Sequence, residues 1–112
     1  MTITQIGDDQ TYGTSLQGYL DTTYDWLVKI FGEPKGEGDG YKVDAQWCLN
    51  IDGKITIIYN YKNGKNYLGE EGTDTKKNRD WYIGGRDSRV VDAVRAAMTA
   101  NDAPYSIKPY SF

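Results

Sequence analysis

The sequence contains no histidine and a single cysteine, Cys48. The chain therefore lacks the side chain that most often titrates near neutral pH and binds metals, and it cannot form an internal disulfide. No apolar run approaches the roughly 18 residues of a membrane span, and no charged segment followed by an apolar stretch indicates a secretory signal. These absences leave serine catalysis without its usual base, and they predict a soluble, cytosolic protein that is not an enzyme and holds no metal or cofactor.

The remaining composition is that of one folded domain covering residues 1–112. The chain has a mass of 12.6 kDa and is 38% hydrophobic and 13% aromatic, enough to bury roughly two-thirds of its unfolded surface. Cys48 has no histidine or adjacent cation to activate it, so we expect a structural or interface thiol.

The charge is slightly negative and unevenly distributed. Thirteen basic and sixteen acidic residues give a net charge of −3, and residues 1–40 alone hold seven acidic and two basic residues, giving −5. A protein that binds duplex nucleic acid needs a basic face to release counterions from phosphates, and no such face is visible. An acidic mimic of nucleic acid would need far more charge than −3. The sequence therefore predicts a partner other than duplex nucleic acid.

Apolar spacing predicts two helices. Thr14 and Gln17 resemble a capping box, apolar residues recur at helical spacing after them, and Gly32 and Pro34 end the pattern, which predicts a helix over 14–31. A second apolar stripe predicts a helix over 88–100.

A β-hairpin is predicted over 43–61, where apolar residues alternate on both sides of Asp52-Gly53. A three-residue loop, Ile51-Asp52-Gly53, would gather these apolar residues on one face of the hairpin. The predicted partners in this register are Leu49 with Ile55, Trp47 with Ile57 and Ala45 with Tyr59. The opposite face would be half polar.

The rest of the chain completes the predicted fold. Residues 62–80 form a long polar loop, residues 81–84 a strand, and residues 103–112 an aromatic tail that docks on this domain or on a partner. We expect an α+β fold in the order α-β-β-β-α, with an antiparallel sheet of about three strands, room for a fourth from a terminus, and two helices packed on one face. The half-polar outer face and the aromatic tail predict a homo-oligomer.

The strongest candidate for a ligand-binding site lies in and around the polar loop. Aromatic faces can stack a base, while Lys, Arg and Asn can bind phosphate and base edges. The candidate ligand-binding residues are Tyr59, Lys62, Asn63, Lys65, Tyr67, Arg79, Trp81 and Arg86. The alternative is that Trp81 and Tyr59 belong to the core and that the lysines keep a surface loop soluble. No catalytic residue is predicted.

Four motifs give the chain a resemblance to small accessory proteins encoded by tailed phages. They are Phe31-Gly32-Glu33-Pro34, Trp47-Cys48-Leu49, Asp52-Gly53 with Thr56-Ile57-Ile58-Tyr59-Asn60-Tyr61-Lys62, and Trp81-Tyr82-Ile83-Gly84-Gly85. The resemblance implies a viral protein that acts in the cytoplasm of a bacterial host and counters host defence. With the candidate residues above, it predicts a non-catalytic protein that sequesters a nucleotide-derived immune signal. The alternative is an inhibitor that binds a host nuclease or effector protein directly.

Overall fold

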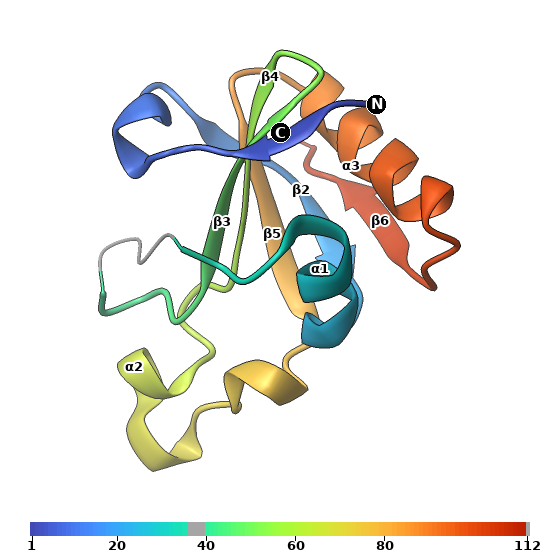
Figure 1. The fold of residues 1–112 in the computed structure, drawn as a ribbon. Helices are drawn as coiled ribbons and strands as arrows, with labels where there is room; N and C mark the ends of the chain where they lie inside the picture. Colours follow the sequence, from blue (N-terminus) through green and yellow to red (C-terminus); the bar gives the residue numbers. More distant parts are fainter. Residues whose placement is uncertain (36–39, 112) are drawn as a thin grey trace.

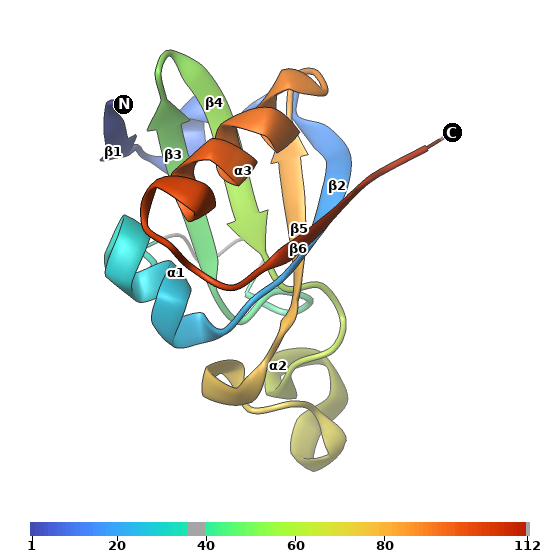
Figure 2. The same cartoon turned by 90° about the vertical axis from the view of Figure 1, so that its right-hand side faces the viewer.

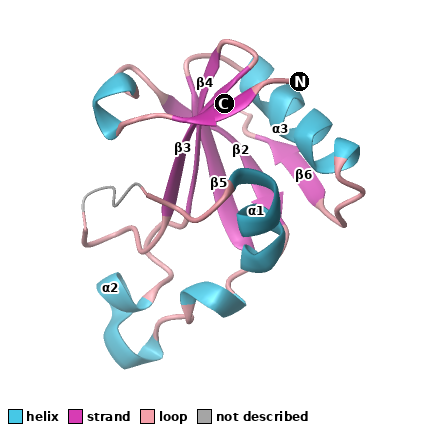
Figure 3. Cartoon of the chain, viewed as in Figure 1, coloured by secondary structure: helices cyan, strands magenta, loops and turns pink. Residues whose placement is uncertain are grey.

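A computed structural model of the chain describes residues 1–35 and 40–111 (Figure 1). The fold class is α+β (Figure 3), built on one six-stranded antiparallel sheet with strand order β1-β3-β4-β5-β2-β6. The strands are β1 (Ile3–Gln5), β2 (Ser15–Asp21), β3 (Gln46–Ile51), β4 (Lys54–Tyr59), β5 (Asp80–Gly85) and β6 (Ser106–Pro109). The α-helices are α1 (Tyr24–Phe31), α2 (Lys65–Leu68) and α3 (Arg89–Ala100). None of the helices in the described ranges combines the length and apolar character of a membrane span.

The predicted three-stranded sheet with two helices, in the order α-β-β-β-α, is therefore wrong. Both chain termini add a strand, because β1 pairs with β3 and β6 pairs with β2. The third added strand is β2 itself, which occupies the first half of the predicted helix. The tail docks on its own domain through β6; Phe112, which the predicted tail includes, lies outside the described residues.

The predicted helix over 14–31 is in fact a strand followed by a shorter helix. The side chain of Thr23, not Thr14, caps the helix by accepting a hydrogen bond from the Trp26 backbone N–H (3.2 Å). In β2 consecutive residues point to opposite faces, so apolar Tyr19 and Leu20 belong to different surfaces of the sheet. Because β2 carries apolar residues on both faces, their spacing also fits a helix, which explains the wrong prediction for this part of the chain.

The hairpin register also differs from the prediction. Asp52 and Gly53 both have positive φ (51° and 87°), the backbone of a two-residue type I′ turn. The register is Leu49 with Thr56, Trp47 with Ile58 and Ile51 with Lys54, instead of Leu49 with Ile55, Trp47 with Ile57 and Ala45 with Tyr59.

Both faces of the hairpin bury apolar side chains, which is why the assumption of one apolar face failed. Cys48 and Ile57 are paired on the face opposite Trp47 and are only 1% and 8% exposed. The N-terminal segment covers that face in part: the Ile6 N–H donates to the Cys48 carbonyl, and the Asp8 carboxylate accepts from the Cys48 thiol (3.0 Å).

Helices α1 and α3 cover one face of the sheet and enclose the main core (Figure 2). Strand residues facing these helices alternate with residues facing away, so the register assigns each strand side chain to one of two surfaces. The largest fully buried side chains are Trp47, Trp81, Leu20, Leu27, Leu49, Ile51, Ile58, Ile83, Met98, Val94, Asn60 and Thr22.

α3 starts one residue inside the helix predicted over 88–100, and β5 extends the strand predicted over 81–84 by one residue at each end.

The segment over 62–80 is not the long loop predicted, because it contains α2 and two 3-10 turns. The side chain of Asn60, 2% exposed, bonds Asp44 and Asn63. Asn63 in turn bonds Asn78 (3.1 Å). This network of amides ties both ends of the segment to the sheet and fixes the position of the side chains that the segment carries.

Candidate binding surface

The sheet face that turns away from α1 and α3 carries a row of aromatic side chains. Tyr19 in β2 pairs with Tyr82 in β5, and Tyr82 pairs with Tyr59 in β4. Side chains of directly opposite residues lie on the same face of a sheet. Lys108 in β6 is the outer partner of Tyr19 and completes the row at the sheet edge.

These tyrosines belong to a larger continuous surface. Ring centroids are 5.4 Å apart for Tyr19 and Tyr82, 5.6 Å for Tyr59 and Tyr82, and 5.8 Å for Tyr61 and Tyr82. Tyr110 extends the chain of rings beyond Tyr19 (6.3 Å).

The surface continues onto the polar segment through a lysine. The Lys62 ammonium lies 5.3 Å from the Tyr61 ring and 5.7 Å from the Tyr67 ring, and Tyr67 contacts Tyr41 (5.1 Å). Seven of the ten tyrosines are thus linked in one surface, here called the tyrosine belt. It consists of Tyr19, Tyr41, Tyr59, Tyr61, Tyr67, Tyr82 and Tyr110.

A cavity of about 390 Å³ opens in the belt. Tyr19, Tyr61 and Tyr82 contribute to its lining, together with a second row of residues two positions along the strands. That row pairs Asp21 with Asp80 across β2 and β5, and Asp21 with Ser106 across β2 and β6. The volume lies within the range of small-molecule sites.

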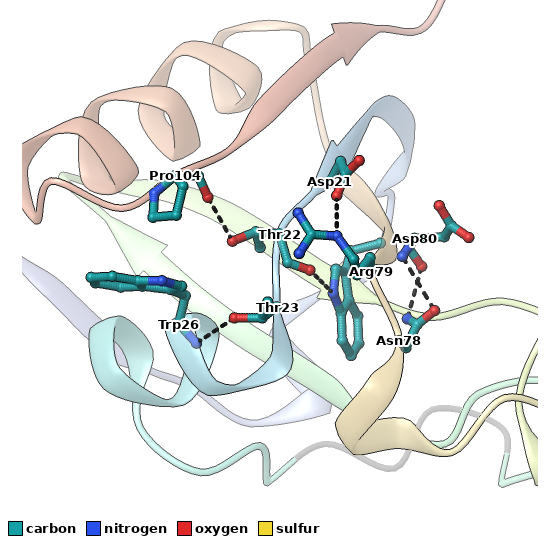
Figure 4. Close-up of polar contacts among 9 residues, drawn as sticks. Asp21, Thr22, Thr23, Trp26, Asn78, Arg79, Asp80 and Pro104 are labelled. Carbon is teal, nitrogen blue, oxygen red and sulfur yellow. Dashed lines mark hydrogen bonds and ion pairs between the residues drawn. The ribbon is translucent and has the colours of Figure 1, made fainter.

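Among the described residues, one charged side chain at the cavity is paired within the protein and two others are not. Arg79 donates to the Asp21 carboxylate (3.0 Å), as Figure 4 shows. Asn78 holds the backbone of Asp80 through its N–H and carbonyl (Figure 4). Within the part of the chain that the structure describes, the exposed carboxylate of Asp80 has no hydrogen bond or ion pair, and neither has the ammonium of Lys108, which also lines the cavity.

Four of the eight predicted site residues lie in or beside the belt. Tyr59 and Tyr67 are members of the belt, Lys62 bridges two of its rings, and Asn63 lines the cavity. Lys65 is exposed at the first position of α2.

The other three residues are engaged in contacts within the protein. The Arg79 guanidinium is paired with Asp21. Trp81 is among the residues that line the cavity, but its side chain is 1% exposed and packs in the core under the helices. Arg86 lies at the other end of β5, where it donates to the backbone carbonyls of Tyr12 and Gln10. The structure therefore does not bring the eight residues together around one ligand-sized space.

Of the ten residues that line the cavity, the predicted site residues include Asn63 and Trp81 and miss eight: Tyr19, Leu20, Asp21, Tyr61, Asp80, Tyr82, Ser106 and Lys108. Tyr82 could have been found, because strand alternation places it on the face opposite Trp81. Tyr19 and Asp21 were assigned to a helix, and Lys108 to a tail, so no sequence signal joined them.

Two groups have pKa values raised to about 12. Burial, and then hydrogen bonding to Asp8, raises the pKa of the Cys48 thiol to about 12, so the thiol stays protonated at neutral pH. Burial also raises the pKa of Tyr59 to about 12, with the neighbouring Tyr82, Tyr61 and Tyr19 adding to the effect. Among the described residues no group of three His, Cys, Asp or Glu side chains is arranged to hold a metal ion.

We expect the free energy of unfolding to fall as pH rises from about 9 to 12. The ordinary pKa values are 9.0 for the cysteine and 10.0 for the tyrosine. Both groups therefore ionise in the unfolded chain at lower pH than in the folded protein, and their contribution to stability, complete below those values, is lost above them. Tyr59→Phe should reduce the part of the fall that occurs above pH 10. Urea unfolding followed by tryptophan fluorescence between pH 8 and 12 measures this effect, with Tyr12→Phe as the control. An unchanged pH profile in Tyr59→Phe would contradict it.

Comparisons of the chain with protein-family models, curated proteins and solved structures give no match.

Proposed function

We propose that this protein is a non-catalytic binding protein that docks its tyrosine belt on a partner protein, acting as a phage-encoded inhibitor of bacterial host defence. The observation that carries the proposal is the linkage of seven tyrosines into one partly exposed surface. Tyrosine is enriched in protein interfaces and at their energetic hot spots. It offers a large, amphipathic contact area at low cost in side-chain entropy.

A protein partner suits this surface better than a nucleotide does. The Trp81 ring is buried and the Arg79 guanidinium is already paired, so two of the groups expected to bind a nucleotide are engaged within the protein. Asp21 at the cavity is already paired with Arg79, which leaves one carboxylate, Asp80, beside one ammonium, Lys108, so the cavity has no excess of positive charge to hold a phosphate. Sequestration of a nucleotide signal stays a prediction and is one outcome of the test below.

The chemistry of the partner follows from charge complementarity. Asp80, which lines the cavity in the belt, has no ion pair among the described residues. A cationic side chain on a partner surface, such as the face that a nuclease or effector presents to nucleic acid, would pair with this carboxylate. The phage setting and the host cytoplasm rest on the resemblance of the sequence motifs, and they are part of the same proposal.

Tyr61→Ala should abolish the anti-defence effect. Tyr61 is 36% exposed, contacts two belt rings and lies beside Lys62, so we expect its loss to weaken partner binding about thirtyfold, as for an interface hot spot of about 2 kcal/mol. The measurements are plaque formation in bacteria carrying individual defence systems, and the Kd for the purified partner from a system that the wild type inhibits. Tyr12→Ala is the matched control, because Tyr12 is 77% exposed and lies at the Arg86 end of β5.

Three results would overturn the proposal. Tyr61→Ala could inhibit defence to the same extent as Tyr12→Ala. Native mass spectrometry could show a bound nucleotide in the wild type and no protein partner. Sedimentation could show that the belt closes on a second copy of the chain, so that Tyr61→Ala converts a dimer to a monomer with no other effect. The last result would also test the predicted homo-oligomer.

A further inference from the structure

We infer that the cavity lined by Tyr19, Tyr61, Tyr82, Asp21 and Asp80 binds a guanidinium group. This inference rests on the proposed function in one respect: the group belongs to an arginine side chain of the partner protein. Three tyrosine side chains and two carboxylates line one cavity of about 390 Å³. Cations bind favourably over tyrosine rings, and a carboxylate next to them adds a charge-assisted hydrogen bond.

The two aspartates create a local need for positive charge. Asp21 and Asp80 are direct partners in neighbouring strands, where Cβ atoms lie about 5 Å apart and like charges destabilise the sheet. Arg79 neutralises Asp21 through its Nε atom (3.0 Å). Nothing in the described residues does the same for Asp80. A cation from a ligand would pair with Asp80 as Arg79 pairs with Asp21.

A guanidinium suits the cavity better than an ammonium does. It is planar and weakly hydrated, it stacks on aromatic faces, and it can donate two parallel hydrogen bonds to one carboxylate. The protein already supplies one ammonium at this place, because Lys108 lines the cavity. Among the described residues that ammonium forms no ion pair, with Asp80 or with any other carboxylate. The Asp80 carboxylate is therefore available to a ligand.

The site is tested with two probes of nearly the same shape, N-acetyl-arginine amide and its neutral analogue N-acetyl-citrulline amide. Binding to the full-length protein is followed by the NMR signals of the tyrosine rings. We expect the arginine probe to shift the rings of Tyr19, Tyr61 and Tyr82 and to bind about fivefold more tightly than the citrulline probe, the upper range for an exposed charge pair.

Charge variants locate the effect. Asp80→Asn should remove most of the preference for arginine, whereas Lys108→Ala should increase arginine affinity about twofold because it removes a competing positive charge. Asp25→Asn is the control: Asp25 is an exposed carboxylate in the first turn of α1, outside the cavity lining, and its loss should change nothing.

Equal binding of the two probes, or an unchanged preference in Asp80→Asn, would overturn the guanidinium site. Binding of a nucleoside monophosphate that Lys108→Ala weakens would also overturn it. Loss of a positive charge lowers the affinity of the cavity for an anion, whereas it should raise the affinity for arginine. The proposed function is judged separately. If arginine does not bind but Tyr61→Ala still loses the partner, the belt is the interface and only this inference fails. If arginine binds as expected but Tyr61→Ala keeps the partner, the site stands and the proposed function fails.

Discussion

Trp81→Ala is expected to lower the free energy of unfolding by about 4 kcal/mol, within the range for deleting a buried aromatic side chain. Trp81 is 1% exposed and meets Trp47 edge to face, with ring centroids 5.4 Å apart. Its indole N–H donates to the backbone carbonyl of the fully buried Thr22 (3.1 Å). The substitution therefore opens a cavity and also removes the partner of a buried polar group. Urea unfolding followed by far-ultraviolet circular dichroism measures the loss.

The conservative variant Trp81→Phe separates a structural role from a role in ligand binding. It keeps an aromatic ring in the core and loses the hydrogen bond to Thr22, so it should cost about half as much and leave partner binding unchanged. Trp26→Ala is the control, because Trp26 is a half-buried residue of α1 whose ring lies under Lys29. If Trp81→Ala were as stable as Trp26→Ala, or if Trp81→Phe abolished binding in a folded protein, the assignment of Trp81 to the core would be wrong.

Elements with side chains buried on one side only were predictable from the sequence. In α3 the residues Val90, Val94 and Met98 face the sheet, and the exposed residues between them leave a clear helical period. In β5 the buried Trp81 and Ile83 alternate with the partly exposed Tyr82, and the two glycines that follow mark where the strand ends. These patterns are informative because water on one side makes the two surfaces chemically different.

Elements with both sides partly buried were not predictable in the same way. In β2, Leu20 faces the helices while Tyr19 faces the belt, and in β3 Trp47 and Cys48 are both buried on opposite faces. A two-sided strand has no simple period, so its apolar residues fit a helix or a shifted register equally well. Pairing with strands from the chain termini, β6 with β2 and β1 with β3, decides between these alternatives. Local sequence does not encode this long-range pairing.

The same reason explains why the belt was recognised only in part. Tyr59 and Tyr67 are close in sequence and were identified together, whereas Tyr19 and Tyr110 reach them through strands β2 and β6. Trp47 and Trp81 fill the core under the helices, where Tyr24 also packs, and the belt tyrosines of the strands occupy the opposite face. Tyrosine suits a half-exposed surface because its ring is apolar and its hydroxyl can remain in water.

Asn60→Ala is expected to lower the free energy of unfolding by about 3 kcal/mol. The Asn60 side chain is 2% exposed, and its oxygen accepts hydrogen bonds from the backbone N–H groups of Asp44 (2.8 Å) and Ala45 (3.0 Å). Its amide nitrogen donates to the side chains of Asp44 and Asn63, each at 3.1 Å. Alanine would replace none of these four contacts and would leave buried donors without a partner. Urea unfolding at pH 7 measures the effect.

The damage should be greatest in the segment over 62–80, because Asn60 is the link between that segment and the sheet. We expect amide hydrogen exchange to accelerate there first, and partner binding to weaken because Tyr61 and Tyr67 would lose their fixed positions at the two sides of Lys62. Asn66→Ala is the matched control: Asn66 lies in the same segment and its side chain makes one hydrogen bond, to the Val43 carbonyl (3.2 Å), so its loss should cost about 1 kcal/mol. Equal stability of the two variants would show that the amide network does not hold the segment, and the tyrosine belt would then need another source of its order.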